Sequence, residues 1–172
     1  MADVVARSTE PTLAAIKLAW WRERLEELDR GKVPAEPRLQ AAFRNLLPKG
    51  IRGADLAELE TGWAGLLRPD VDMKVVLGRG EMLFAFAARL IDAEPPGTLP
   101  VAGGIYAAGA IARRGLMPAD ASVTSWVPPV PPAFRRLTMF AALARRDLSR
   151  REPEASPGRA WTLLRHRLTG KL

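Results

Sequence analysis

The sequence of this 172-residue chain predicts an all-α fold, and three observations support that prediction. Between Leu13 and Asp29, apolar side chains recur at the 3.6-residue spacing of an amphipathic helix. No stretch alternates apolar and polar residues for long enough to make a convincing strand. Proline and glycine stand where helices should begin and end, as Pro11 and Gly31 do around this stretch. We therefore expect residues 1–172 to form one domain, a bundle of about six to seven helices.

The helix over residues 13–29 is the one around which we expect the others to pack. Its main apolar stripe falls within about 80° of the helix circumference. The stripe consists of Ala14, Leu18, Trp21, Leu25 and Leu28. A second apolar face covers only the first half of the helix and is made of Leu13, Ile16 and Trp20. Burial on two sides at the start of the helix, and on one side later, should follow.

The spacing of apolar residues and of helix-boundary residues predicts the remaining helices. They should cover residues 37–47, 53–68, 72–91, 100–114, 132–150 and 156–170. The helix over 100–114 consists largely of alanine and glycine. Such a helix either packs tightly against another helix or leaves room for a ligand, and the sequence favours tight packing.

The last of these helices has both of its ends marked in the sequence. Ser156 is the expected N-cap, and Gly170 is the expected end. Its apolar stripe, which we expect to face inward, consists of Trp161, Leu164 and Leu168.

Two segments should lie outside the helices. Residues 1–8 should be frayed. The proline-rich residues 115–132 should form a stiff loop, either a structural connector pinned by Trp126 or a polyproline ligand for another protein, with the connector favoured.

The residue content excludes several classes of protein. The chain has no cysteine, which excludes a disulfide framework, a thiol nucleophile and a cysteine-ligated metal. Because His166 is the only histidine, a multi-histidine zinc site and a Ser-His-Asp triad are not expected. The N-terminus does not resemble a signal peptide, and no continuous apolar run is long enough to cross a bilayer. We expect a cytoplasmic protein.

The positive charge is concentrated at the C-terminal end. The chain has a net charge of +7, and residues 133–172 contain 10 Lys and Arg against three Asp and Glu. Three interpretations stay open: an ordinary solvated surface, contact with an anionic membrane (here the inner membrane surface), and, least favoured, nucleic-acid binding. The candidate basic surface consists of Arg145, Arg146, Arg150, Arg151, Arg159, Arg165, Arg167 and Lys171.

The segment from Leu18 to Glu23, LAWWRE, resembles a segment typical of the squalene/phytoene synthase family. Gly31-Lys32 and Pro37 follow it in the order found there, and then come a helix with Trp63, an apolar helix and a Gly/Ala-rich helix. The ending, from Ala144 through the Ser-Pro-Gly-Arg at 156–159 to Leu168, is similar to short bacterial members. The resemblance implies a truncated isoprenoid-synthase fold, a helical bundle around an apolar cavity.

Enzymes of that family join two prenyl diphosphates, and aspartate-rich segments hold the Mg²⁺ that assists departure of the diphosphate. This chain departs from that pattern. No pair of aspartates is spaced by four residues, and residues 93–146 contain one aspartate, Asp120. The acidic residues that do cluster are expected on solvated helix faces. We therefore expect no metal site, no catalytic residue and no cofactor, with Mg²⁺ required only if the chain is an active synthase.

Five residues are candidates for the lining of a ligand cavity, and they are Lys17, Trp20, Trp21, Arg22 and Tyr106. Three of them have a plainer alternative. Lys17 can lie along an indole with its amine in water, Arg22 can pair with Glu26 one turn later, and Tyr106 can be a core residue.

These observations lead to a ranked set of functions. The first is a non-catalytic squalene/phytoene-synthase-like domain that binds a hydrophobic, isoprenoid-type ligand or a protein partner. The alternative is an active prenyl-diphosphate transferase of isoprenoid or carotenoid synthesis. The third is a basic adaptor at a membrane surface, of the assembly-factor type, and nucleic acid is the least favoured partner.

Overall fold

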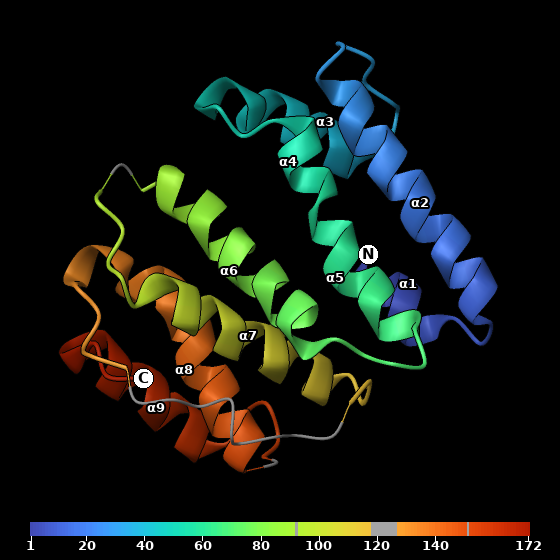
Figure 1. Ribbon diagram of the computed structural model, residues 1–172. Coiled ribbons are helices and arrows are strands. Elements are labelled where there is room, and N and C mark those ends of the chain that lie inside the picture. The colour runs from blue at the N-terminus through green and yellow to red at the C-terminus, as the bar shows by residue number, and fades with distance from the viewer. Residues whose placement is uncertain (92, 118–126, 151) are drawn as a thin grey trace. The chain divides into compact units, whose positions relative to one another are not determined.

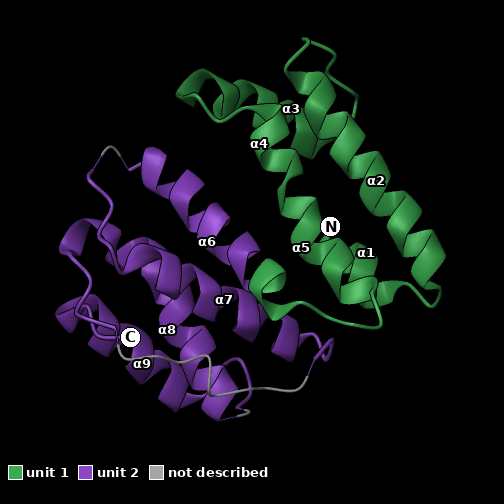
Figure 2. Cartoon of the chain, viewed as in Figure 1, with its two compact units in different colours: residues 1–76 green, residues 77–172 purple. Residues whose placement is uncertain are grey.

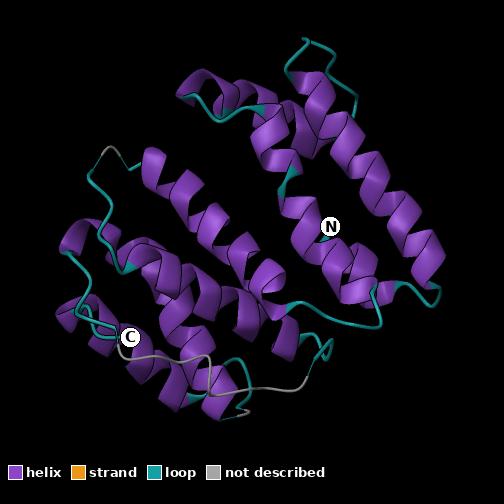
Figure 3. Ribbon diagram, viewed as in Figure 1, coloured by secondary structure: helices purple, strands orange, loops and turns teal. Residues whose placement is uncertain are grey.

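The computed structural model confirms the all-α prediction. It describes residues 1–91, 93–117, 127–150 and 152–172, and no strand occurs among them (Figure 3). The helices up to residue 67 are α1 (Ala2–Arg7), α2 (Pro11–Leu28), α3 (Pro37–Asn45), η1 (Leu47–Lys49), α4 (Gly53–Ala57), α5 (Leu59–Ala64) and η2 (Gly65–Leu67) (Figure 1). Those that follow are α6 (Met73–Arg89), α7 (Leu99–Arg113), η4 (Pro132–Phe134), α8 (Arg135–Ser149) and α9 (Pro157–Thr169).

The chain divides into two compact units (Figure 2). The first unit is Met1–Val76 and the second is Leu77–Leu172, so that α6 begins in the first and continues through the second. The grouping of residues 1–172 into one domain stays a prediction, and each unit has a core of its own.

In the first unit, α2 buries its main stripe as predicted. Ala14, Leu18, Leu25 and Leu28 are buried, and Trp21 is half-buried. The second apolar face is not buried, however: Ile16 is 62% exposed and Trp20 is 43% exposed. The neighbouring helices of this unit, chiefly α4 and α5, pack along the main stripe, and the prediction of burial on two sides is wrong.

The end of α2 also fixes the start of α4. The carboxylate of Asp29 accepts hydrogen bonds from the backbone N–H groups of Gly53, at 2.6 Å, and Ala54, at 2.9 Å. These are two of the N–H groups that a helix leaves without partners at its N-terminus. Position 53 must be glycine because a Cβ there would lie 3.1 Å from the Leu25 carbonyl carbon and closer still to its oxygen.

The predicted helix over 53–68 is instead three short helices, α4, α5 and η2. The chain bends at Glu58, which ends α4 and begins α5. Trp63 and Leu56 are buried.

In the second unit, α7 packs tightly against α6 and α8. A Cβ at Gly103 would lie 2.8 Å from the Cα of Glu81 on α6, and a Cβ at Gly109 would lie 2.8 Å from the Cα of Ala144 on α8. Contacts this short leave no room for a side chain. The small residues of this helix therefore serve close packing, the alternative that the sequence favoured.

The last helix, α9, has the predicted ends, but the face that it buries is not the predicted one. The Ser156 hydroxyl accepts a hydrogen bond from the Arg159 N–H at 3.3 Å, and Gly170 has the left-handed φ of 72° that ends the helix. The predicted inward stripe of Trp161, Leu164 and Leu168 is exposed, whereas His166 is buried. The prediction that this stripe faces inward is wrong because polar contacts of His166 fix the rotation of the helix.

Of the two segments expected outside the helices, the first is helical. Residues 1–8 are not frayed: α1 covers Ala2–Arg7, and Val5 is buried. Within the predicted loop at 115–132, residues 118–126 lie outside the described residues, and with them Trp126. After them, the Val130 N–H donates to the Gly170 carbonyl at 2.8 Å, which joins the loop to the end of α9.

None of the helices in the described part of the chain combines the length and the apolar character that crossing a bilayer requires.

The close approach of α7 to α6 leads to a stability prediction. Gly103→Ala should lower the free energy of unfolding by about 1–3 kcal/mol, because the new Cβ forces the two backbones apart. Gly78→Ala on α6 is the matched control, since a Cβ there meets no atom within 4 Å. It should stabilise the protein by about 0.5–1 kcal/mol through helix propensity. Urea unfolding of both variants measures the difference, and equal effects would contradict the packing described.

Candidate functional site

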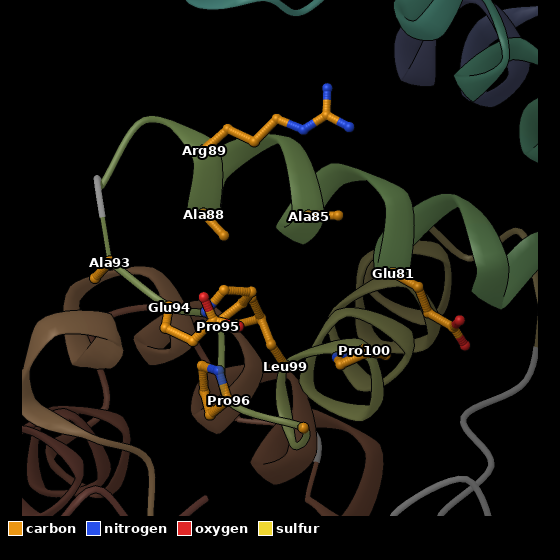
Figure 4. Close-up of a pocket in the computed structure, with 11 residues that line it drawn as sticks. Glu81, Ala85, Ala88, Arg89, Ala93, Glu94, Pro95, Pro96, Leu99 and Pro100 are labelled. Carbon is orange, nitrogen blue, oxygen red and sulfur yellow. The ribbon is translucent and has the colours of Figure 1, made fainter.

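An apolar pocket of the second unit lies between α6, α7 and the segment that connects them (Figure 4). Its volume is about 740 Å³. The residues of this α6–α7 pocket are Glu81, Ala85, Ala88, Arg89, Ala93, Glu94, Pro95, Pro96, Gly97, Leu99 and Pro100. All but three of them are apolar or lack a side chain.

Small residues on α6 and stiff residues after it build this pocket. Ala88 points from α6 toward Pro95 in Figure 4, and Ala85 lies one turn earlier on the same helix. The Leu99 N–H donates to the Pro96 carbonyl at 2.9 Å, which turns the chain into α7. Ala88 and Leu99 are buried, whereas Ala85 is exposed at the edge. Short side chains on one wall and fixed proline rings on the other leave the hollow.

The charged residues of the α6–α7 pocket lie at its margin. Glu81, Arg89 and Glu94 are all exposed. In Figure 4 the Arg89 side chain extends from the side of α6 opposite to Ala88, and its guanidinium carbon lies 5.9 Å from the centre of the Phe86 ring. The interior is therefore suited to an apolar molecule, because binding such a molecule there would remove apolar surface from water.

The four cavity candidates on α2 belong to the first unit, and their role in a cavity stays a prediction. Lys17 is exposed, and the Trp20 and Trp21 rings pack edge to face with their centres 5.2 Å apart. The Arg22 guanidinium lies 2.7 Å from a Glu58 carboxylate oxygen and 3.1 Å from one of Glu60.

These ion pairs of Arg22 are structural contacts within the first unit. The guanidinium also lies 3.4 Å from Glu26, the partner that the sequence offered, whereas Glu58 and Glu60 were not anticipated. The hydrogen bond to Glu58 raises the pKa of Arg22 above its usual value despite partial desolvation. Arg22 thus joins α2 to the α4–α5 segment.

The fifth candidate, Tyr106, belongs to the second unit. Its ring lies 5.6 Å from the ring of Phe84 and 6.4 Å from that of Phe140, measured between centres. It borders a smaller pocket of about 430 Å³ that Arg113, Arg114 and other residues of α7, α8 and α9 share. Both proposed roles of Tyr106 stay open, since the ring packs in an aromatic group and also borders a pocket.

The α6–α7 pocket was not predicted from the sequence. Its walls are alanine and proline, which carry no chemical signature. One signal was available: Pro95-Pro96-Gly97 follows an apolar helix and precedes a helix of small residues. A stiff connection between two such helices keeps their ends apart.

The predicted basic surface separates into two sets. Arg146 and Arg159 are engaged in ion pairs. Arg146 lies 2.6 Å from Glu152, and Arg159 contacts Asp147, which is buried and also lies 3.2 Å from Arg113. We call Arg113, Arg146, Arg159, Asp147, Glu152 and Glu154 the arginine–carboxylate network.

The remaining predicted basic residues are not in this network. Arg150, Arg165, Arg167 and Lys171 are exposed, and none of them forms a salt bridge with another described residue. Arg145 is half-buried on α8, and Arg151 lies outside the described residues.

Glu152 has a strongly lowered pKa. Hydrogen bonds from Arg146 and from the Ser156 hydroxyl, at 2.7 Å, lower its pKa to about 2. Within the described residues, no three His, Asp or Glu side chains gather in a way that would hold a metal ion.

The burial of Asp147 leads to a second stability prediction. Asp147→Asn should lower the free energy of unfolding by about 3 kcal/mol, because it leaves two arginines without their shared partner. Glu154→Gln is the matched control: this carboxylate is 85% exposed and lies 3.4 Å from Arg113, and its loss should cost less than about 0.5 kcal/mol. Thermal and urea unfolding compare the two. Equal losses would show that Asp147 is not the centre of the network.

The pKa of Glu152 leads to a prediction about acid. Because its folded-state pKa is lowered from 4.5 to about 2, the stabilisation is complete above pH 4.5 and is lost as the pH falls toward 2. Glu152→Gln should therefore be less stable than the wild type above pH 4.5, and the difference should shrink toward zero near pH 2. Urea midpoints across this range test it. A difference that stays constant with pH would contradict the ion pair.

Comparison with protein-family models, with curated proteins and with solved structures gives no match to this chain. The resemblance to squalene/phytoene synthases therefore rests on the residues quoted for it, above all the segment from Leu18 to Glu23. It stays a prediction.

Proposed function

We propose that this chain binds an apolar, isoprenoid-type molecule in the α6–α7 pocket and does not carry out metal-dependent prenyl transfer. The observation that carries the proposal is the apolar hollow of about 740 Å³ between α6 and α7. Pockets that hold small molecules typically measure about 300–1,000 Å³ and have mostly apolar walls.

Two arguments support the choice of ligand and the absence of catalysis. The segment from Leu18 to Glu23 and the order of helices after it resemble a family whose substrates are isoprenoid. The chain lacks the paired aspartates with which that family holds Mg²⁺. A domain that keeps an apolar pocket and lacks the diphosphate-activating groups is suited to binding without turnover.

A chain-length series of isoprenoid alcohols tests this function. Farnesol and geranylgeraniol should bind, as measured by calorimetry with the full chain, and geranylgeranyl diphosphate with Mg²⁺ should not be consumed. Ala85→Trp, at the exposed edge of the pocket, should weaken binding about tenfold or more by filling the hollow.

The matched control is Ala160→Trp, which places the same side chain on an exposed position of α9 away from the pocket. It should bind the alcohols as the wild type does. Equal affinities of the two tryptophan variants would place the ligand elsewhere, and turnover of the diphosphate would favour the alternative of an active synthase.

A further inference from the structure

The helix α9 presents an apolar stripe to solvent. Trp161 is 64% exposed, Leu164 is 48% exposed and Leu168 is 68% exposed. These residues stand at positions i, i+3 and i+7 and therefore share one side of the helix. We call them the outer face of α9.

The rotation of α9 is fixed from its buried side. His166 is 0% exposed, and its two ring nitrogens each lie 2.9 Å from a partner, Nε2 from the Thr138 hydroxyl and Nδ1 from the Lys171 carbonyl. A carbonyl oxygen only accepts, so Nδ1 carries a proton and donates it. Because a buried polar group that loses its partner is costly, the helix resists turning.

A second set of contacts fixes the C-terminal end of α9. The Arg135 guanidinium on α8 donates to the carbonyls of Arg167, at 3.1 Å, and Leu168, at 2.9 Å. These groups have no partner within the helix itself. The outer face is thus exposed because these hydrogen bonds hold α9 in place, and not because a terminal helix frays.

Positive charge borders the outer face on both sides. At about 100° per residue, Arg165 lies on one side of the stripe and Arg167 on the other. A groove of about 390 Å³ is lined in part by Arg136 of α8 and by Leu164 and Arg167 of α9. The helix α9 contains no acidic residue. Among the described residues, none of these arginines is in a salt bridge.

This combination of an apolar stripe and flanking arginines fits one kind of surface. We propose that the outer face of α9 docks on an anionic phospholipid bilayer, with Trp161, Leu164 and Leu168 among the acyl chains and Arg165 and Arg167 at the phosphates. Helices of this kind lie in the plane of the interface, where tryptophan is favoured and where arginine keeps its charge among the headgroups. Charge complementarity selects an anionic membrane over a neutral one. The ligand pocket of α6 and α7 is not required for this docking.

The test measures partitioning of the full chain onto vesicles of phosphatidylcholine alone and of phosphatidylcholine with phosphatidylglycerol. The wild type should sediment with the anionic vesicles and bind them less as salt increases. Replacing Trp161, Leu164 and Leu168 together by serine should lower the partition coefficient about tenfold or more. Replacing Arg165 and Arg167 by glutamine should lower it about tenfold, on the anionic vesicles only.

The chain offers a matched control for each variant. Leu13, Ile16 and Trp20 on α2 are exposed apolar residues of the same kinds, and Arg30 and Arg38 are exposed arginines. Their serine and glutamine variants should bind as the wild type does, and circular dichroism checks that every variant is folded. Equal losses in the α2 and α9 variants, binding to neutral vesicles as strong as to anionic ones, or no vesicle binding at low salt would each overturn the proposal. So would an oligonucleotide that competes with the vesicles and binds independently of Trp161.

Discussion

The second unit depends on the close contact of α7 with the helices on either side of it. Gly103 and Gly80 let the backbones of α7 and α6 meet, and Gly109 lets α7 meet Ala144 on α8. At this separation, main-chain atoms determine where each helix lies, and large side chains are excluded. The contact with α6 sets the wall on which the α6–α7 pocket forms. The contact with α8 places Thr138 and Arg135, the residues that orient α9.

Much of the fold was predictable because helical periodicity is a local property. The ranges of α2, α3, α6, α7, α8 and α9 follow from apolar spacing and from Pro, Ser and Gly at helix ends. The faces were less predictable. Periodicity shows that Trp20 and Trp161 lie on apolar stripes, but it does not show whether another element covers the stripe. The stripe through Leu18 is covered by α4 and α5, and those through Trp20 and Trp161 are exposed.

The candidate sites were less accessible to sequence reasoning, for two physical reasons. The α6–α7 pocket is a shape formed by Ala88, Pro95 and their neighbours, and shape is not encoded in residue chemistry. The basic C-terminal end could be recognised in the sequence from its number of charged residues. Which of these residues form ion pairs could not. Asp147 and Glu152 neutralise some arginines through contacts that the fold creates. Which arginines form no salt bridge becomes clear only from the arrangement of α8 and α9 in the structure.

The orientation of α9 is the reverse of the usual one, in which apolar side chains are buried and polar side chains are exposed. If apolar burial alone set the rotation of α9, Trp161 would face inward, because burying one large apolar side chain stabilises the fold by about 1.5–3 kcal/mol. Here the buried position belongs to His166, which is satisfied at both nitrogens by Thr138 and the Lys171 carbonyl. Turning the helix would leave these polar groups without partners and would break the contacts of Arg135 with its last carbonyls. A few directional hydrogen bonds therefore keep three apolar side chains exposed to water. These side chains are then accessible to another apolar surface.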